Sequence, residues 1–318
     1  GNESLTFSGN SATGTPRLLW LGGKLSNNLT LTTNMPAYGI QNLEVNAGQT
    51  LTLQAGVVVK MSGQLRVLGT LAAQGTAQAP VVFTSPRDDT HSGDTNGDGS
   101  ASLPTPGEWS QLSIENNGQA TLAHTLIRFA GTSLSGYASN AANQAVNLTV
   151  TDSIFEQNSG TGIYLRDDDA TQQSSLTVSN STFRNNSGYG IDAQYYSTGV
   201  GNVSITGSTF TNNGYGARLY GVGDVTVSGN SFTGHNQTGL EVNATNATVT
   251  NNSFSNNGVS HGELYGNESL IVSGNSATST PRLLWLGGKL TSDLTLGTSM
   301  PAYGLRELVV NAGQTLTL

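Results

Sequence analysis

One pattern recurs five times in the middle of the chain, as LTVTDSIF (148–155), LTVSNSTF (176–183), VSITGSTF (203–210), VTVSGNSF (225–232) and ATVTNNSF (247–254). Successive Phe residues are 28, 27, 22 and 22 residues apart. Each segment carries two alternating apolar residues, such as Val203 and Ile205, which predicts a short strand with one inward face. LIVSGNSA (270–277) and LTFSGNSA (5–12) continue the series.

A turn is expected at a fixed position in each segment, two residues after the second apolar residue. That position holds Asp152, Asn180, Gly207, Gly229, Asn251 and Gly274. Asp, Asn and Gly tolerate a left-handed backbone better than other residues. The Phe then points back to the core, and a second strand begins after a Gly, as at Gly190 and Gly216. Short strands, sharp turns and a period near 22 residues predict an all-β parallel solenoid, in which each coil buries its apolar face by stacking.

The five Phe segments resemble the coils of the right-handed parallel β-helix family, which includes pectin-lyase-like and periplasmic copper-protein-like proteins. Residues 55–85 resemble the β-helix segments of bacterial secreted and surface proteins, and residues 86–109 resemble the loop insertion that often accompanies them. The resemblance implies a right-handed parallel β-helix over nearly the whole chain, and an extracellular or cell-surface location in a bacterium. An antiparallel β-sandwich would instead show two-residue hairpin turns every 8–12 residues.

The chain also repeats on a larger scale. Residues 1–53 match residues 266–318 at about 41 of 53 positions without a gap. We therefore expect one full repeat unit over 1–265, with its loop insertion at 86–109, and the start of a second copy over 266–318. Leu316 to Leu318 correspond to Leu51 to Leu53, after which the first copy continues into another coil, so we expect uncapped ends.

Charge and composition exclude several classes of protein. The 12 Lys and Arg residues against 20 Asp and Glu residues give a net charge of −8, which disfavours nucleic acid and anionic membranes as partners. The sequence contains no apolar run long enough for a membrane span. The absence of Cys excludes disulfides, Cys–zinc sites and a Cys nucleophile.

Near-identical repeats favour a structural role as the first interpretation. We expect a non-catalytic tandem-repeat module of an extracellular fibre, sheath or giant surface adhesin, which contacts itself by end-to-end continuation and by lateral packing of rods. The alternative is a polysaccharide-binding or polysaccharide-degrading β-helix of the lyase or glycosidase type, whose partner would be a surface polysaccharide. A phage tail fibre or spike is a third interpretation.

One loop segment has the spacing of a calcium site. Asp94, Asn96 and Asp98 place oxygen ligands at alternate positions before Gly99, and Asp88, Asp89 and Glu108 are close enough in sequence to complete the coordination shell. Thr105 stands where an EF-hand has its bidentate Glu. The residues therefore predict an isolated structural Ca²⁺ loop, with a plain Asp/Asn/Gly turn as the alternative.

Two further groups are candidates for sugar chemistry. Arg166 with Asp167, Asp168 and Asp169 is the candidate catalytic set of the alternative function, since glycosidases hold two carboxyl groups across the sugar. Residues 188–192 resemble a segment of sugar epimerases of this fold, and also fit an ordinary coil start. Tyr195, Tyr196, Tyr215 and Tyr220 recur near coil turns and suit either sugar stacking or packing in the solenoid.

Overall fold

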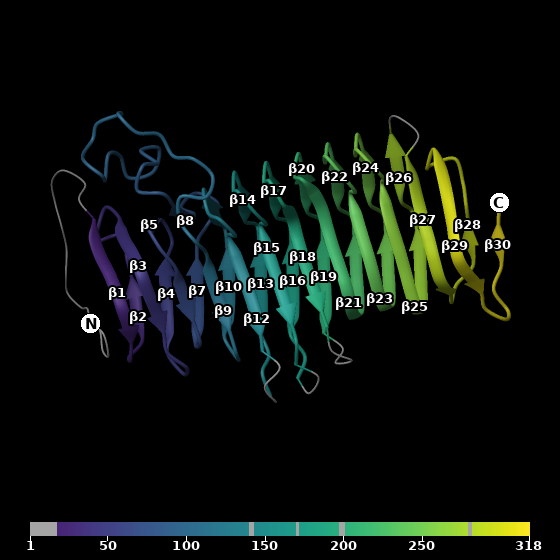
Figure 1. Ribbon diagram of the computed structural model, residues 1–318, viewed down its shortest axis with the longest axis horizontal. Helices are drawn as coiled ribbons and strands as arrows, with labels where there is room; N and C mark the ends of the chain where they lie inside the picture. The colour runs from purple at the N-terminus through teal and green to yellow at the C-terminus, as the bar shows by residue number, and fades with distance from the viewer. Residues whose placement is uncertain (1–17, 140–142, 170–171, 197–200, 279–281) are drawn as a thin grey trace.

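The structure, a computed structural model, describes residues 18–139, 143–169, 172–196, 201–278 and 282–318. The predicted LTFSGNSA segment at 5–12 lies outside these residues. The described chain is a right-handed parallel β-helix of about 12 coils, stacked along the long axis of the molecule from the N-terminal to the C-terminal side (Figure 1). All strand pairs are parallel, as the sequence predicts.

Three ladders of strands run the length of the solenoid. Ladder 1 contains β5 (Val58–Met61), β8 (Val81–Thr84), β11 (Thr125–Arg128), β14 (Ile154–Glu156), β17 (Thr182–Arg184), β20 (Thr209–Thr211), β22 (Ser231–Thr233), β24 (Ser253–Ser255) and β26 (Ser276–Thr278). Ladder 2 contains β6 (Leu65–Val67), β9 (Leu112–Glu115), β12 (Leu134–Ala138), β15 (Ile163–Asp167), β18 (Tyr189–Tyr195) and the first parts of β21 (Tyr215–Ser228), β23 (Leu240–Thr250), β25 (Gly262–Ser273) and β27 (Leu283–Leu290). Ladder 3 contains β2 (Leu29–Leu31), β4 (Thr50–Gln54), β7 (Thr70–Gln74), β10 (Gln119–Ala123), β13 (Asn147–Thr151), β16 (Ser175–Ser179), β19 (Asn202–Thr206) and the second parts of β21, β23 and β25.

The end coils use longer strands. At the N-terminal end, β1 (Leu19–Leu25) and β3 (Tyr38–Val45) each run from ladder 1 into ladder 2. At the C-terminal end lie β29 (Ala302–Val310), which pairs with β27, and the short pair β28 (Leu294–Thr295) and β30 (Leu316–Thr317).

The two copies of the large repeat enter different ladders. Leu21 of the first copy pairs with Ile40, and β3 continues this row to β5 in ladder 1. The equivalent Leu286 pairs with Leu264 of β25, in ladder 2. The offset of 265 residues therefore spans a whole number of coils plus one strand, and the same sequence folds as strand in either ladder. The division into units at 1–265 and 266–318 stays a prediction.

The inward side chains form continuous rows. Phe155, Phe183, Phe210, Phe232 and Phe254 stack with ring centroids 5.0, 4.9, 4.7 and 5.4 Å apart, and none is more than 1% exposed. Stacked aromatic pairs stabilise beyond the burial of their surface, by about 0.5–1.5 kcal/mol each. The Phe pattern of the sequence thus becomes one row of rings down the centre of the solenoid.

The chain turns at two corners of each coil, and residues with a left-handed backbone conformation occupy these corners. The predicted corner position is confirmed, because Asp152, Asn180 and Asn251 have φ values of 49°, 49° and 56° and Gly207, Gly229 and Gly274 also have positive φ. His124 occupies the same corner one coil earlier, with φ 44°. A second left-handed corner follows ladder 1, for example at Asn185, whose φ is 55°. For L-residues other than Asn and Asp this conformation costs about 1–2 kcal/mol.

Buried polar rows satisfy the backbone next to these corners. Asn252 Oδ1 accepts the Asn230 N–H at 2.9 Å, while Asn252 Nδ2 donates to the Val227 carbonyl at 2.9 Å. At the second corner, Asn213 repeats this arrangement with the Asn186 N–H at 3.0 Å and the Phe183 carbonyl at 2.9 Å. Each side chain therefore joins its coil to the one before it and satisfies one N–H and one carbonyl group of that coil.

His235 takes one place in the second polar row. Its Nδ1 accepts the Asn213 N–H at 3.2 Å, but its Nε2 is buried without a partner. Burial lowers the pKa of His235 to about 4. The unfolded chain therefore binds a proton at a higher pH than the folded chain does.

The substitution His235→Asn should make the fold less sensitive to acid. Between pH 6.5 and about 4 only the unfolded chain holds this proton, so the free energy of unfolding of the natural sequence should fall with pH by about 3 kcal/mol. Chemical denaturation over this range should show a smaller fall for His235→Asn, with stability at neutral pH retained. His124→Asn, at a partly exposed corner, is the control. Equal slopes for His235→Asn and the natural sequence would contradict the assignment.

Candidate functional site

Tyrosines gather on the outer surface of ladder 2. Along each strand inward residues such as Ile163 and Leu165 are buried, so the residues between them face outward. We call the outward side chains of β12 to β25 in this ladder, with the adjoining Tyr189, Tyr196 and Tyr215, the tyrosine face. It carries seven of the ten tyrosines, namely Tyr137, Tyr164, Tyr189, Tyr196, Tyr215, Tyr220 and Tyr265.

Several of these rings are open to solvent. Tyr196 is 59% exposed and Tyr220 is 51% exposed. Tyr189 and Tyr215 stack on one another with their centroids 4.3 Å apart. Exposed, flat rings with a hydroxyl at one end combine an apolar surface with a polar group. The tyrosine face therefore suits the apolar C–H surface and the hydroxyl groups of a sugar.

An ion pair between a buried carboxylate and a half-buried guanidinium lies in the central row of the tyrosine face. The Arg218 Nε donates to Asp192 Oδ1 at 2.9 Å, and its second nitrogen donates to Oδ2 at 2.7 Å. Asp192 is only 4% exposed and also accepts a hydrogen bond from Gln194 at 2.9 Å. The Arg218 guanidinium lies 4.5 Å from the Tyr189 ring centroid. The hydrogen bond to Asp192 raises the pKa of Arg218, so the guanidinium keeps its charge. The two hydrogen bonds also hold it in one position.

Two carboxyl groups follow Arg218 in the same row. Register places Glu241 beside Arg218, and Glu263 beside Glu241, on successive coils. Burial raises the pKa of Glu241, and the nearby Glu263 and Asp192 charges add to this, while Arg218 opposes it. Glu241 therefore keeps its proton to a higher pH than an ordinary Glu, which is the property required of a general acid.

An open depression of about 230 Å³ lies beside these carboxyl groups. Its lining combines the paired Arg, the two Glu residues, two tyrosines and an amide, namely Arg218, Leu219, Tyr220, Glu241, Val242, Asn243, Glu263 and Tyr265. The depression thus brings together proton-donating, hydrogen-bonding and stacking groups. The sequence alone did not single out Arg218, Glu241 or Glu263, whereas Asp192 ends the segment 188–192 that resembles sugar epimerases.

The predicted Arg166–Asp169 set divides between two roles. Arg166 Nε lies 3.0 Å from both carboxylate oxygens of Asp168, and its guanidinium lies 5.0 Å from the Tyr196 ring centroid, so both charged residues belong to the tyrosine face. Asp167 and Asp169 are each 1% exposed. Asp167 accepts the Asp169 N–H at 2.9 Å and the Ser174 N–H at 3.1 Å. Asp169 accepts the Gln144 N–H of the preceding coil, so both carboxylates bind backbone groups and are closed to the surface.

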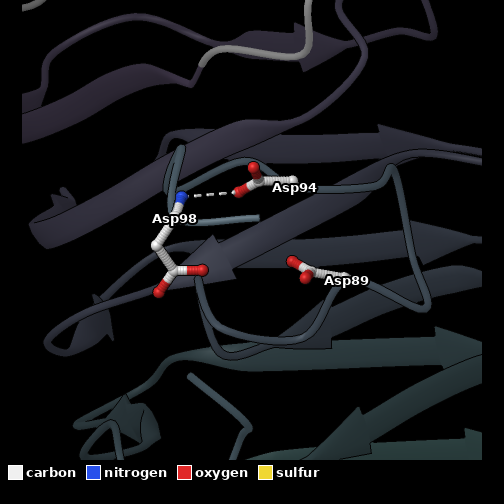
Figure 2. A group of neighbouring side chains, drawn as sticks. All are labelled: Asp89, Asp94 and Asp98. Carbon is white, nitrogen blue, oxygen red and sulfur yellow. Dashed lines mark hydrogen bonds between the residues drawn. The ribbon is translucent and has the colours of Figure 1, made fainter. Parts of the chain in front are cut away.

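The loop insertion extends from ladder 1 between β8 and β9 (Figure 1). Asp89, Asp94 and Asp98 converge within it, with one carboxylate oxygen of each within 4.8 Å of the others (Figure 2). Asp94 accepts N–H groups of Gly97 at 2.6 Å, Asp98 at 3.1 Å and Gly99 at 2.8 Å. One Asp89 oxygen is buried without a hydrogen-bond partner. Oxygen donors in this arrangement suit a hard cation.

The other predicted calcium ligands bind elsewhere or lie beside this cluster. Asn96 is adjacent, and its amide donates to Asp98 at 3.0 Å. Asp88 is fully buried and accepts hydrogen bonds from Thr84 at 2.5 Å and from Thr90. Glu108 accepts from Ser85, from Arg87 at 3.1 Å and from Thr105. Asp88 and Glu108 therefore hold the loop onto ladder 1 and do not join the three Asp residues.

Comparison with known proteins gives little beyond the fold. Among solved structures, the chain is similar to that of a mutant of the periplasmic alginate epimerase AlgG, with 12% identity, a TM-score of 0.29, and coverage of 86% of this chain and 77% of that one. A search of curated proteins gives no match. In the part of the chain that the structure describes, there is no helix of the length and hydropathy that a membrane span needs.

The first prediction of function was wrong in the light of these comparisons. The sequence favoured a non-catalytic module of a fibre, sheath or adhesin, whereas the solved structure that was found belongs to an epimerase, an enzyme. The findings agree better with the alternative of a polysaccharide-binding or polysaccharide-degrading β-helix. The substrate of the epimerase is not transferred to this chain, because the likeness extends to the fold only.

The family assignment rests on the coils themselves. The family described as the right handed beta helix region matches residues 110–200 and 138–295, which together cover more than half of the chain. These residues include the five Phe segments and the whole tyrosine face. The chain therefore belongs to the right-handed β-helix family.

Proposed function

We propose that this protein binds a polysaccharide along the tyrosine face and hydrolyses a glycosidic bond there with Glu241 and Glu263. The observation that carries the proposal is the pair of carboxyl groups in one row of neighbouring coils, one of which has a raised pKa, beside a depression with two tyrosines. Glycosidases use such a pair, with one group protonated and one ionised.

The binding step follows from the geometry of the ladder. Tyr220 and Tyr265 stand in one outward row, with Asn243 between them on the intervening coil. Coils repeat about every 4.8 Å along the solenoid, so the tyrosine face offers a regular series of rings and amides to an extended polymer. Stacking on the rings and hydrogen bonds from Asn243 and Gln194 would orient a sugar chain over the two Glu residues.

The chemical step uses the two Glu residues in different states. Glu241 donates its proton to the glycosidic oxygen as the bond from that oxygen to the anomeric carbon breaks. Glu263, as a carboxylate, attacks the anomeric carbon and forms a glycosyl ester as that bond breaks. Water then attacks the same carbon: its hydroxyl group stays on the new reducing end, its proton returns to Glu241, and the ester bond to Glu263 breaks. Glu241 and Glu263 project from adjacent strands that lie about 4.8 Å apart, so their carboxyl groups can adopt the separation of about 5–5.5 Å that retaining glycosidases use. We therefore propose retention of configuration.

We also propose that the protein acts in the cell envelope or outside the cell. The support is the resemblance of residues 55–85 to the β-helix segments of bacterial secreted and surface proteins. Self-association of the solenoid by its ends or sides stays a prediction from the sequence.

The substitution Glu241→Gln tests the function. It removes the proton donor while keeping shape, so release of reducing ends from a polysaccharide panel should fall by about 10²–10⁴-fold, with binding retained. In the natural sequence activity should be lost as pH rises through the raised pKa of Glu241, since only the protonated group is active. Glu44→Gln is the control, because Glu44 lies in the same outward row but is paired with Lys24 and Arg66. Unchanged release by Glu241→Gln, measured alongside circular dichroism, would sink the proposal.

We propose in addition that Asp89, Asp94 and Asp98, with Asn96, hold a structural Ca²⁺. The support is the convergence of three carboxylates and the unpartnered, buried oxygen of Asp89. A cation there would link the tip of the insertion to its base, because Asp89 lies near the start of the loop and Asp98 lies in its middle.

Calcium should raise the melting temperature of a metal-stripped sample. We expect a shift that saturates with added Ca²⁺ and that is absent in Asp94→Asn. Asp224→Asn, which alters an exposed carboxylate on ladder 3, should keep the shift. No calcium-dependent shift in the natural sequence would remove the site, as would an equal shift in Asp94→Asn.

A further inference from the structure

The tyrosine face has few cations, and all of them are paired. Between Arg128 and Arg282 the sequence contains three Arg residues and no Lys. Arg166 pairs with Asp168 at 3.0 Å and Arg218 pairs with Asp192 at 2.7 Å. The third, Arg184, lies on ladder 1 and pairs with Glu156. The cations of the tyrosine face thus form ion pairs with carboxylates of the protein itself.

Arg218 in particular already binds one anion of the protein. Two of its nitrogens donate to the two oxygens of Asp192, and the face of its guanidinium lies against Tyr189. A bidentate Arg–carboxylate pair fixes the planar cation in one orientation. An incoming carboxylate that took the same two nitrogens would have to displace Asp192, which is buried.

The groups that remain at the depression repel anions. Glu241 and Glu263 lie next to one another, and the nearest carboxylate on the other side is Asp192. The whole chain carries a net charge of −8. A sugar with one carboxylate or sulfate per residue would place several negative charges beside these acids, whereas hydroxyl groups can bond to Asn243, Gln194 and the tyrosines without that penalty.

We infer that the tyrosine face takes an uncharged polysaccharide, and that polyuronates and sulfated glycans are not its substrates. The inference rests on the proposed function, since it names the substrate class of the same site. It also separates this chain from an enzyme that acts on an acidic polymer, because the selectivity lies in the paired arginines and the unpaired Glu residues of the face.

Affinity electrophoresis with matched polymers tests the inference. The full chain is run through gels with neutral glucans, xylans, mannans and galactans, and with polyuronates before and after chemical reduction of their carboxyl groups. We expect retardation by at least one uncharged polymer, equal at low and high salt, and at least tenfold weaker retardation by every acidic one. Tyr220→Ala should weaken the binding about tenfold, and Thr226→Ala, on the outer surface of ladder 3 in the same strand, should not.

Each outcome decides between the two proposals. Salt-insensitive binding of an uncharged polymer, lost in Tyr220→Ala, supports both. Binding of an acidic polymer that equals or exceeds that of its carboxyl-reduced form, and that weakens in Tyr220→Ala, keeps the proposed function and overturns the uncharged substrate. Failure of every polymer to retard the natural sequence, or binding unaffected by Tyr220→Ala, overturns the proposed function and the inference with it.

Discussion

In a parallel solenoid, each position of one coil lies about 4.8 Å from the same position of the next. Each side chain must therefore pack against the side chain at the same position of the neighbouring coil. Apolar and aromatic residues satisfy this constraint by stacking, as the row from Phe155 to Phe254 does. Asn residues satisfy it by hydrogen bonding from coil to coil, as Asn230 and Asn252 do. The core and the corners of this protein are built from these two solutions.

This constraint disfavours residues of like charge at the same position of neighbouring coils. The adjacent Glu241 and Glu263 are an exception to it. Two carboxylates directly opposite one another in a ladder repel. Burial raises the pKa of Glu241, and the charge of Glu263 adds to this, as expected where two carboxyl groups share a site. Elsewhere in the row the signs alternate, as in Glu44 with Arg66 and Asp192 with Arg218. A local departure from the rule, placed beside a depression, is typical of a site and not of a structural row.

The fold was predictable from the sequence because its determinants are local. Asn180 and Gly207 mark corners by residue type alone, and the Phe spacing marks the coils. The site was harder to predict from the sequence, because its residues come from five coils and each coil contributes a single side chain. A signal was present, since Tyr164, Asp192, Arg218 and Glu241 each stand two residues after the Gly that begins the second strand. Asp167 and Asp169 misled for a different reason: a run of three Asp residues does not reveal which of them faces inward at a turn.

The most direct test of the central claim is the structure of a complex with an uncharged oligosaccharide that binds the protein. Sugar rings should lie along ladder 2, stacked on Tyr220 and on a neighbouring tyrosine, with a glycosidic oxygen within hydrogen-bond distance of Glu241. Sugar bound along ladder 1 or ladder 3, or on the loop insertion, with the tyrosine face empty, would contradict it.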